Sequence, residues 1–267
     1  MARRLISHSE VDAFEQCEKK HYYGHELKLT KPHHGDGLNR GNAGHKYLEV
    51  WAKAMLEEGY TSEMAQIKAL QETAHMPNAV DALQLVIPWV KDIWPTLGWK
   101  IIAVEGEYRV TITETLVFPF KFDLLVEIKG EIVVVDHKFL YDLYTQEMID
   151  IFPQPVKYMA GLRSHGIDVK YAIYNMFRTR KTEIDKYKQL ETRPNAFRIK
   201  TAMQEQVEGM KRIEAKNPIP LRTANKMNCG NCQFAPLCAA ELRGENTQLM
   251  RDNFYVHNTY GYTDIEE

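Results

Sequence analysis

The fold is decided by residues 116–138, which read LVFPFKFDLLVEIKGEIVVVDHK. Two runs rich in Val, Ile, Leu and Phe flank Lys129 and Gly130, and a glycine-containing pair between such runs is typical of a tight hairpin turn. The stretch therefore predicts two antiparallel strands, over 116–128 and 132–138.

A third strand and several helices surround this hairpin. Residues 101–113 alternate and are β-branched, which adds a strand and predicts an antiparallel meander. A fourth strand is expected over 168–177, after a helix, and this strand–helix–strand order implies a parallel, right-handed crossover. Apolar residues at helical spacing predict helices over 7–28, 40–58, 61–75, 79–94, 145–165 and 196–216.

These elements predict an α/β fold, with a small mixed β-sheet flanked by helices. We expect a single domain over residues 1–267. Within it we expect a helical insertion at 46–95, a sheet core with the active site at 100–178, and a basic helix with a cysteine-rich segment at 196–240.

Composition excludes several classes of protein. The chain has 267 residues, of which 44% are hydrophobic and 26% charged, and this usage excludes a disordered chain and a fibrous rod. No apolar run reaches the ~18 residues that a membrane-spanning helix needs. The first residues carry charge without the apolar stretch of a secretory signal, so we expect a cytosolic protein.

Charge is distributed unevenly along the chain. The net charge is −2, but residues 163–226 contain more Lys and Arg than Asp and Glu. A basic stretch in an acidic protein could face phosphates, and it could equally be a solvated helical surface.

The strongest chemical signal is a set of charged residues on the predicted hairpin. Asp123 interrupts an apolar strand, and Asp136 and Lys138 are two residues apart, so their side chains project from the same face. If the strands pair across the turn, Asp123 lies near Asp136. Two buried carboxylates repel, and Mg²⁺ or Mn²⁺ would remove that repulsion while Lys138 positions a water. The alternative is a surface ion pair at a strand end.

The four cysteines suggest a second metal group. Cys229, Cys232 and Cys238 form a C-x2-C-x5-C pattern, and Cys17 lies more than two hundred residues upstream. Four thiolates can hold a 4Fe-4S cluster or a tetrahedral zinc ion. The three-plus-one grouping favours the cluster over zinc, with unrelated free thiols as the third possibility.

Several short motifs, taken in order, resemble one family. They are an Asp followed by Asp-x-Lys at 123–138, ISHS at 6–9 with CEKKHYY at 17–23, RGNAGH at 40–45, QPVKY at 154–158, and the cysteine triplet. The set resembles the PD-(D/E)XK nuclease superfamily, with its restriction-endonuclease-like core. It is most similar to the RecB-like branch with an iron–sulfur cluster, which includes the AddB nuclease domain and CRISPR-associated RecB-like exonucleases.

The resemblance implies roles for individual residues. His45, Asp123 and Asp136 would ligate the divalent metal, with the His137 backbone carbonyl as a further ligand, and Lys138 would activate or position the attacking water. Gln154 and Tyr158 would orient Lys138 and the DNA backbone, and Glu107 or Glu105 would join the metal site. The 4Fe-4S cluster would be held by Cys17, Cys229, Cys232 and Cys238.

The implied function is metal-dependent hydrolysis of DNA phosphodiester bonds. The expected substrates are single strands or duplex ends, cut by an exonuclease in DNA recombination, repair or phage DNA processing. Basic residues that could line the DNA path are Arg178, Arg180, Lys181, Arg198 and Lys200. Two alternatives remain, namely a nuclease-like DNA-binding adaptor of a recombination or CRISPR-type complex, and an iron–sulfur electron carrier. The complete Asp–Asp–Lys set favours the enzyme.

Overall fold

The computed structural model describes residues 3–32, 35–182 and 185–258. The chain divides into two compact units. We call residues 35–108 and 120–202 the sheet unit, and residues 1–34, 109–119 and 203–267 the cysteine unit. Within the described ranges, no helix combines the length and the apolar character that crossing a membrane requires.

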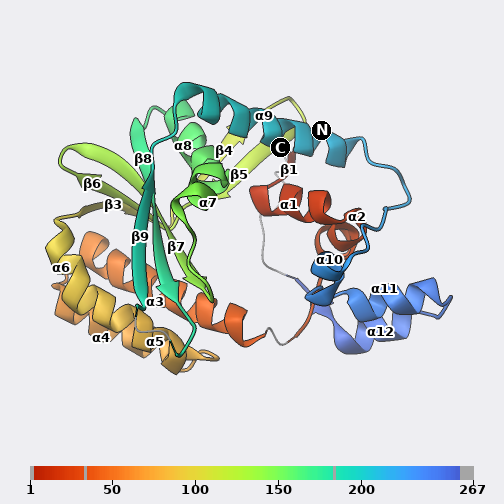
Figure 1. Ribbon diagram of the computed structural model, residues 1–267, viewed down its shortest axis with the longest axis horizontal. Helices are drawn as coiled ribbons and strands as arrows, with labels where there is room; N and C mark the ends of the chain where they lie inside the picture. Colours follow the sequence, from red (N-terminus) through yellow and green to blue (C-terminus); the bar gives the residue numbers. More distant parts are fainter. Residues whose placement is uncertain (1–2, 33–34, 183–184, 259–267) are drawn as a thin grey trace. The chain divides into compact units, whose positions relative to one another are not determined.

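A five-stranded mixed sheet organises the sheet unit (Figure 1). The strand order is β3-β6-β7-β8-β9, with bounds Lys100–Val104, Leu124–Ile128, Glu131–Leu140, Val169–Arg178 and Tyr187–Thr192. Strand β7 pairs antiparallel with β6 and parallel with β8, which confirms the predicted hairpin and crossover. Lys129 and Gly130 form the turn with φ values of 52° and 83°, the left-handed geometry that a tight hairpin needs.

Helices cover both faces of this sheet (Figure 1). One face carries α3 (Asp36–Glu57), α4 (Ser62–Thr73), α5 (Ala79–Pro88), η2 (Trp89–Ile93) and α6 (Trp94–Leu97), whose apolar residues share a core with alternate residues of the strands. The other face carries α7 (Gln146–Ile151) and α8 (Gln154–Ser164). The predicted helix at 145–165 is therefore broken at Pro153, which comes just before the first residue of α8.

The two long strands predicted before the turn pair with each other as the meander requires, but each is divided in two. Residues 101–113 divide into β3 and β4 (Glu107–Thr111), and residues 116–128 divide into β5 (Leu116–Lys121) and β6. Strands β4 and β5 belong to a separate three-stranded sheet with β1 (Arg4–Leu5). At the break, Glu105 adopts a φ of 52°, and the Phe122 ring lies so close to Gly106 that a Cβ on this residue would lie 2.4 Å from the ring.

The cysteine unit is mostly helical. Its elements are α1 (His8–Gln16), α2 (Glu18–His21), η1 (Tyr22–Glu26), β2 (Leu29–Thr30), α10 (Lys226–Gly230), α11 (Ala235–Leu242), α12 (Gln248–Phe254) and β10 (Val256–His257). Helix α9 (Ala196–Glu214) begins in the sheet unit and continues into this one. Ser7 caps α1 by accepting a hydrogen bond from the Glu10 amide.

Candidate active site

Two carboxylates converge where strands β6 and β7 pair. Leu124 lies opposite Val135, so the next step of the register places Asp123 opposite Asp136. Directly opposed residues of an antiparallel pair project from the same face, with Cβ atoms about 5 Å apart. Asp136 is buried, and Asp123 accepts a 2.7 Å hydrogen bond from the His137 amide. The pairing predicted from the sequence is therefore present.

Lys138 joins Asp136 to helix α8. Its Nζ lies 2.7 Å from Asp136 Oδ2 and donates a 2.9 Å hydrogen bond to Gln154 Oε1. Gln154 Nε2 in turn donates a 2.8 Å hydrogen bond to the Tyr158 hydroxyl. Four of the residues singled out from the sequence thus form one chain of polar contacts in a single unit.

Two histidines lie near this pair of strands, and one of them, His45, approaches a carboxylate. Nδ1 of His45, on α3, lies 3.6 Å from Asp123 Oδ1. The His137 ring is buried on the face opposite Asp136, against Trp89, and its Nδ1 lies 2.8 Å from Asn175 Nδ2. Asn175 escaped the sequence analysis, although a buried amide inside an apolar strand is itself a signal. A ligand role for the His137 carbonyl stays a prediction.

Of the two candidate glutamates, Glu105 is the one whose pKa is affected by the charge of Asp123. The negative charge of Asp123 helps raise the pKa of Glu105, after burial, and Glu105 forms an ion pair with Lys121. Glu107 opens β4 and is exposed, and its role in the site stays a prediction. Lys121 was not singled out from the sequence, because only the break after β5 brings it beside Glu105.

The charges in this site are only partly compensated. Burial raises the pKa of Asp123, and burial together with the charge of Asp123 raises the pKa of Asp136. Burial opposes the charged form of Lys138, but Asp136 and Asp123 outweigh it and raise the pKa of that amine. Burial and the neighbouring Lys138 lower the pKa of His45, which favours a neutral imidazole. The site therefore holds buried negative charge that a cation would stabilise.

The donor set fits one class of metal ion. Oδ2 of Asp136 contacts Lys138 but accepts no well-aligned hydrogen bond from any described residue. Across the described residues, no three His, Cys, Asp or Glu side chains are arranged to hold a metal ion. Mg²⁺ seldom uses such a cage, since one or two carboxylates plus water and substrate oxygens suffice. Asp123 and Asp136 fit this mode of binding.

The cysteines do not form a metal site in the described structure. All four are reduced and line one cavity of about 250 Å³ in the cysteine unit. Arg222 Nε donates to Cys238 Sγ at 3.2 Å, and Cys17 Sγ lies 3.8 Å from the Leu221 carbonyl oxygen. No group of three thiols within the described ranges is arranged to ligate a metal. The structure thus does not support the predicted 4Fe-4S cluster.

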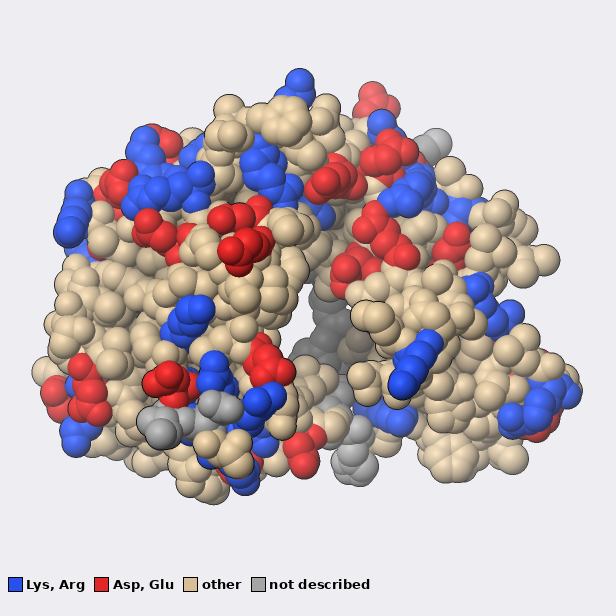
Figure 2. Space-filling view, in the orientation of Figure 1, with Lys and Arg blue, Asp and Glu red and all other residues tan. Residues whose placement is uncertain are grey.

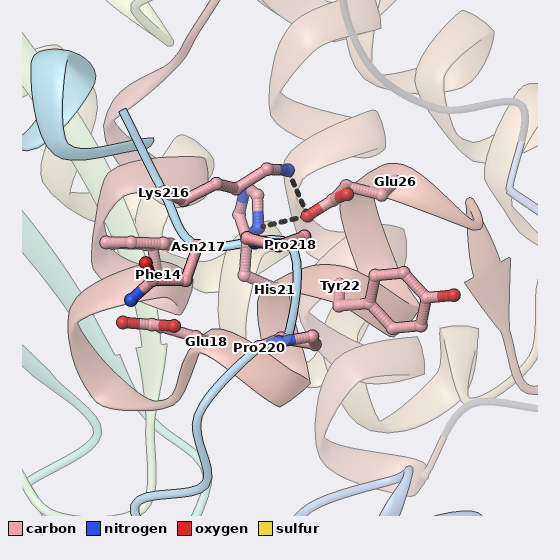
Figure 3. A pocket seen from close by; sticks show the side chains of 9 residues that line it. All are labelled: Phe14, Glu18, His21, Tyr22, Glu26, Lys216, Asn217, Pro218 and Pro220. Carbon is pink, nitrogen blue, oxygen red and sulfur yellow. Dashed lines mark ion pairs between the residues drawn. The ribbon is translucent and has the colours of Figure 1, made fainter. Parts of the chain in front are cut away.

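A second cavity in the same unit differs from the active site because its charges are matched (Figure 3). It has a volume of about 190 Å³ and lies between the helices near His21 and the segment 216–220. His21 lies 3.0 Å from Glu10 and 3.3 Å from Glu26, and Lys216 also forms an ion pair with Glu26. Lys216 pairs with Glu26 and Arg4 pairs with Glu10, so these two carboxylates create no demand for a metal ion.

The basic residues proposed for a DNA path are largely engaged. Arg180 pairs with Asp142, Lys181 lies 3.3 Å from Asp81, and Arg198 donates to a backbone carbonyl. Figure 2 shows acidic and basic side chains interspersed over the face in view. This mixture agrees with the solvated-surface interpretation of the charge run, and a DNA path along these residues stays a prediction.

Comparison with solved structures shows the fold. A candidate exonuclease from Eubacterium rectale matches with a TM-score of 0.55 and 12% sequence identity, and the match covers 87% of each chain. LHK-Exo, solved in complex with dAMP, matches with a TM-score of 0.31 and 13% identity over 65% of this chain and 91% of its own. A search of curated proteins found no match.

The family is shown by the sequence as a whole. The model of the PD-(D/E)XK nuclease superfamily matches residues 5–239, which include both carboxylates, the lysine and the glutamine described above. This chain belongs to the PD-(D/E)XK nuclease superfamily.

Proposed function

We propose that this protein is a Mg²⁺- or Mn²⁺-dependent deoxyribonuclease that removes nucleotides from DNA ends. The observation that carries the proposal is the convergence of Asp123, Asp136 and Lys138, with Gln154 holding the lysine from behind. A surface ion pair would not need a second buried carboxylate on the neighbouring strand. Membership of a nuclease family makes a phosphodiester the fitting substrate.

The residues of this chain divide the chemistry between them. Asp123 and Asp136 would hold a divalent ion, which when bound acts as a Lewis acid and stabilises charge on the phosphate. Lys138 stays protonated, because two carboxylates raise its pKa, so it acts as a hydrogen-bond donor rather than as a free base. It directs the attacking water and stabilises the charge that develops on a phosphate oxygen. Gln154 fixes the direction of the ammonium through its 2.9 Å contact.

Removal of nucleotides from ends is supported by the fold shared with the candidate exonuclease from Eubacterium rectale and by the motifs that resemble RecB-like enzymes. An exonuclease requires a free end, so a closed circular duplex distinguishes it from an endonuclease.

The test is digestion of end-labelled linear DNA and of closed circular DNA, with Mg²⁺ or Mn²⁺ and with a chelator. We expect linear DNA to be degraded only with metal, and Lys138→Ala to lower the rate by about a hundredfold or more, the scale of losing one donor to the developing charge. Lys170→Ala is the matched control, because Lys170 is an exposed lysine paired with Asp168. Tight DNA binding without cleavage in either metal would instead identify an adaptor.

The iron–sulfur cluster remains a separate prediction. It is supported by the resemblance and by the shared cavity of the four cysteines, but their thiols are not in ligating positions among the described residues. Iron and sulfide analysis of anaerobically purified protein tests it directly. Colourless protein with one zinc per chain, or with no metal at the cysteines, would eliminate the cluster without affecting the nuclease proposal.

A further inference from the structure

Tyr174 lies directly beside the metal-binding carboxylate. In the parallel pairing of β7 with β8, Tyr174 is the register partner of Asp136. The Tyr174 side chain is 1% exposed and packs with Ile149 and Met176, on the sheet face covered by α7 and α8. Asp136 and Tyr174 therefore project from the same face of neighbouring strands.

Both side chains carry a polar atom whose hydrogen bonding is incomplete. The Tyr174 hydroxyl is buried and has no hydrogen-bond partner among the described residues, and Asp136 Oδ2 has only its ion pair with Lys138. An unpartnered buried hydroxyl costs about 1–3 kcal/mol, and native proteins keep few such groups without a reason. The Tyr174 hydroxyl and Asp136 Oδ2 lie on adjacent strands of one site, which suggests that they act together.

The Tyr174 hydroxyl keeps its proton and can donate a hydrogen bond. Burial raises the pKa of Tyr174, and the negative charge of Asp136 raises it further, so the phenol keeps its proton. The ring of Tyr144 packs edge-on against Tyr174 at 6.1 Å and restricts its movement. A neutral phenol thus lies on the strand next to a buried carboxylate whose Oδ2 accepts no hydrogen bond from the described residues.

We propose that Tyr174 is a positioning residue for Asp136. When the cation binds, its hydroxyl donates a hydrogen bond to the carboxylate, directly or through one water, and holds Asp136 in the orientation that ligates the ion. The inference rests on the proposed function, because it assumes that Asp136 is a ligand. It also explains how Lys138 can turn from Asp136 to a phosphate without leaving the carboxylate unsupported.

The test is Mn²⁺ binding by isothermal titration calorimetry, with Tyr174→Phe compared with the wild-type protein. Loss of an outer partner of a metal ligand typically lowers affinity about ten- to a hundredfold, and we expect that loss here. The melting temperature without metal should stay unchanged or rise, since the variant removes an unpartnered hydroxyl. Cleavage by the variant should recover when the Mn²⁺ concentration is raised, which a general loss of structure would not allow.

Two further variants keep the outcomes distinct. Tyr187→Phe is the matched control. Tyr187 lies on β9, pairs with Phe177 on β8 and contacts Trp89 on the opposite face of the sheet, so this variant should bind Mn²⁺ as tightly as the wild type. Asp136→Asn should abolish binding. If Tyr174→Phe binds Mn²⁺ with wild-type affinity while Asp136→Asn does not bind it, only the positioning role of Tyr174 is overturned. That role is also overturned if Tyr174→Phe and Tyr187→Phe lose Mn²⁺ affinity and melting temperature to the same extent. A wild-type protein that binds no Mn²⁺ would overturn this role and the nuclease proposal together.

Discussion

Neutralising Asp123 should stabilise the metal-free protein. Asp123→Asn keeps an oxygen that can accept the 2.7 Å hydrogen bond from the His137 amide, but it removes one of two opposed buried charges. Burial raises the pKa of Asp123, which means that folding disfavours its ionised form. The wild-type protein without metal should therefore lose stability as the pH rises from the usual aspartate range through the raised pKa.

The expected gain follows from the pairing of β6 and β7. Opposed Cβ atoms about 5 Å apart imply carboxylate charges about 6 Å apart, which repel by about 3 kcal/mol at an effective dielectric constant of about 20. The variant also loses the attraction of Asp123 to Lys138 and Lys121, which offsets part of this gain. We expect a net stabilisation of about 1–2 kcal/mol, or a melting temperature higher by a few degrees in a chain of this size.

Thermal unfolding monitored by circular dichroism, with and without Mg²⁺, measures this effect. Metal should raise the melting temperature of the wild-type protein and leave that of Asp123→Asn unchanged, so the order of the two reverses. Asp81→Asn is a control that should change stability in the opposite direction, because Lys181 and Arg40 pair with Asp81 and lower its pKa. That variant should lose stability and keep the metal response. The reasoning is refuted if Asp123→Asn is less stable than the wild type without metal and still responds to Mg²⁺.

Three other outcomes are expected. Gln154→Ala should lower kcat about tenfold with DNA affinity unchanged, because it releases Lys138; stopped-flow cleavage and fluorescence anisotropy measure the two quantities. Metal affinity should fall on acidification at a pH above the usual aspartate range, because burial raises the pKa of both site carboxylates; calorimetry across pH tests this. Gly161→Ala should destabilise the fold by about 1–3 kcal/mol in urea unfolding, because its Cβ would lie 2.3 Å from the Phe120 ring, and Phe120→Leu should restore part of the loss.

The position of the site could be predicted because it depends on local pairing. A two-residue turn at Lys129 and Gly130 fixes the register of the hairpin, and that register alone places Asp123 opposite Asp136. The contact of Lys138 with Gln154 is of longer range, and it followed from the resemblance rather than from spacing.

Other features could not be predicted because they depend on tertiary packing. The strand breaks near Glu105 and Phe122 fall inside runs with strong β-propensity, which does not reveal the φ of 52° at Glu105 or the close packing of the Phe122 ring against Gly106. Strand β9 is half polar, and only its pairing with β8 identifies it. Closely spaced cysteines share a cavity, but sequence spacing does not set the distances between their sulfur atoms.

The strand break and the active site are physically connected. A continuous strand through residues 116–128 would surround Asp123 with ladder partners and apolar neighbours on both sides. Because the chain leaves β5 at Lys121 and enters β6 at Leu124, Asp123 lies at the end of a strand, where His45 approaches it from α3. Its partner Asp136 remains inside β7 and is held by Lys138. Asp123, with 19% of its side chain exposed, is the more accessible carboxylate, and Asp136, with 7%, is the more buried one, which suits an ion that must bind both the protein and a phosphate. The local β-propensity of this segment is thus overridden beside one of the two site carboxylates.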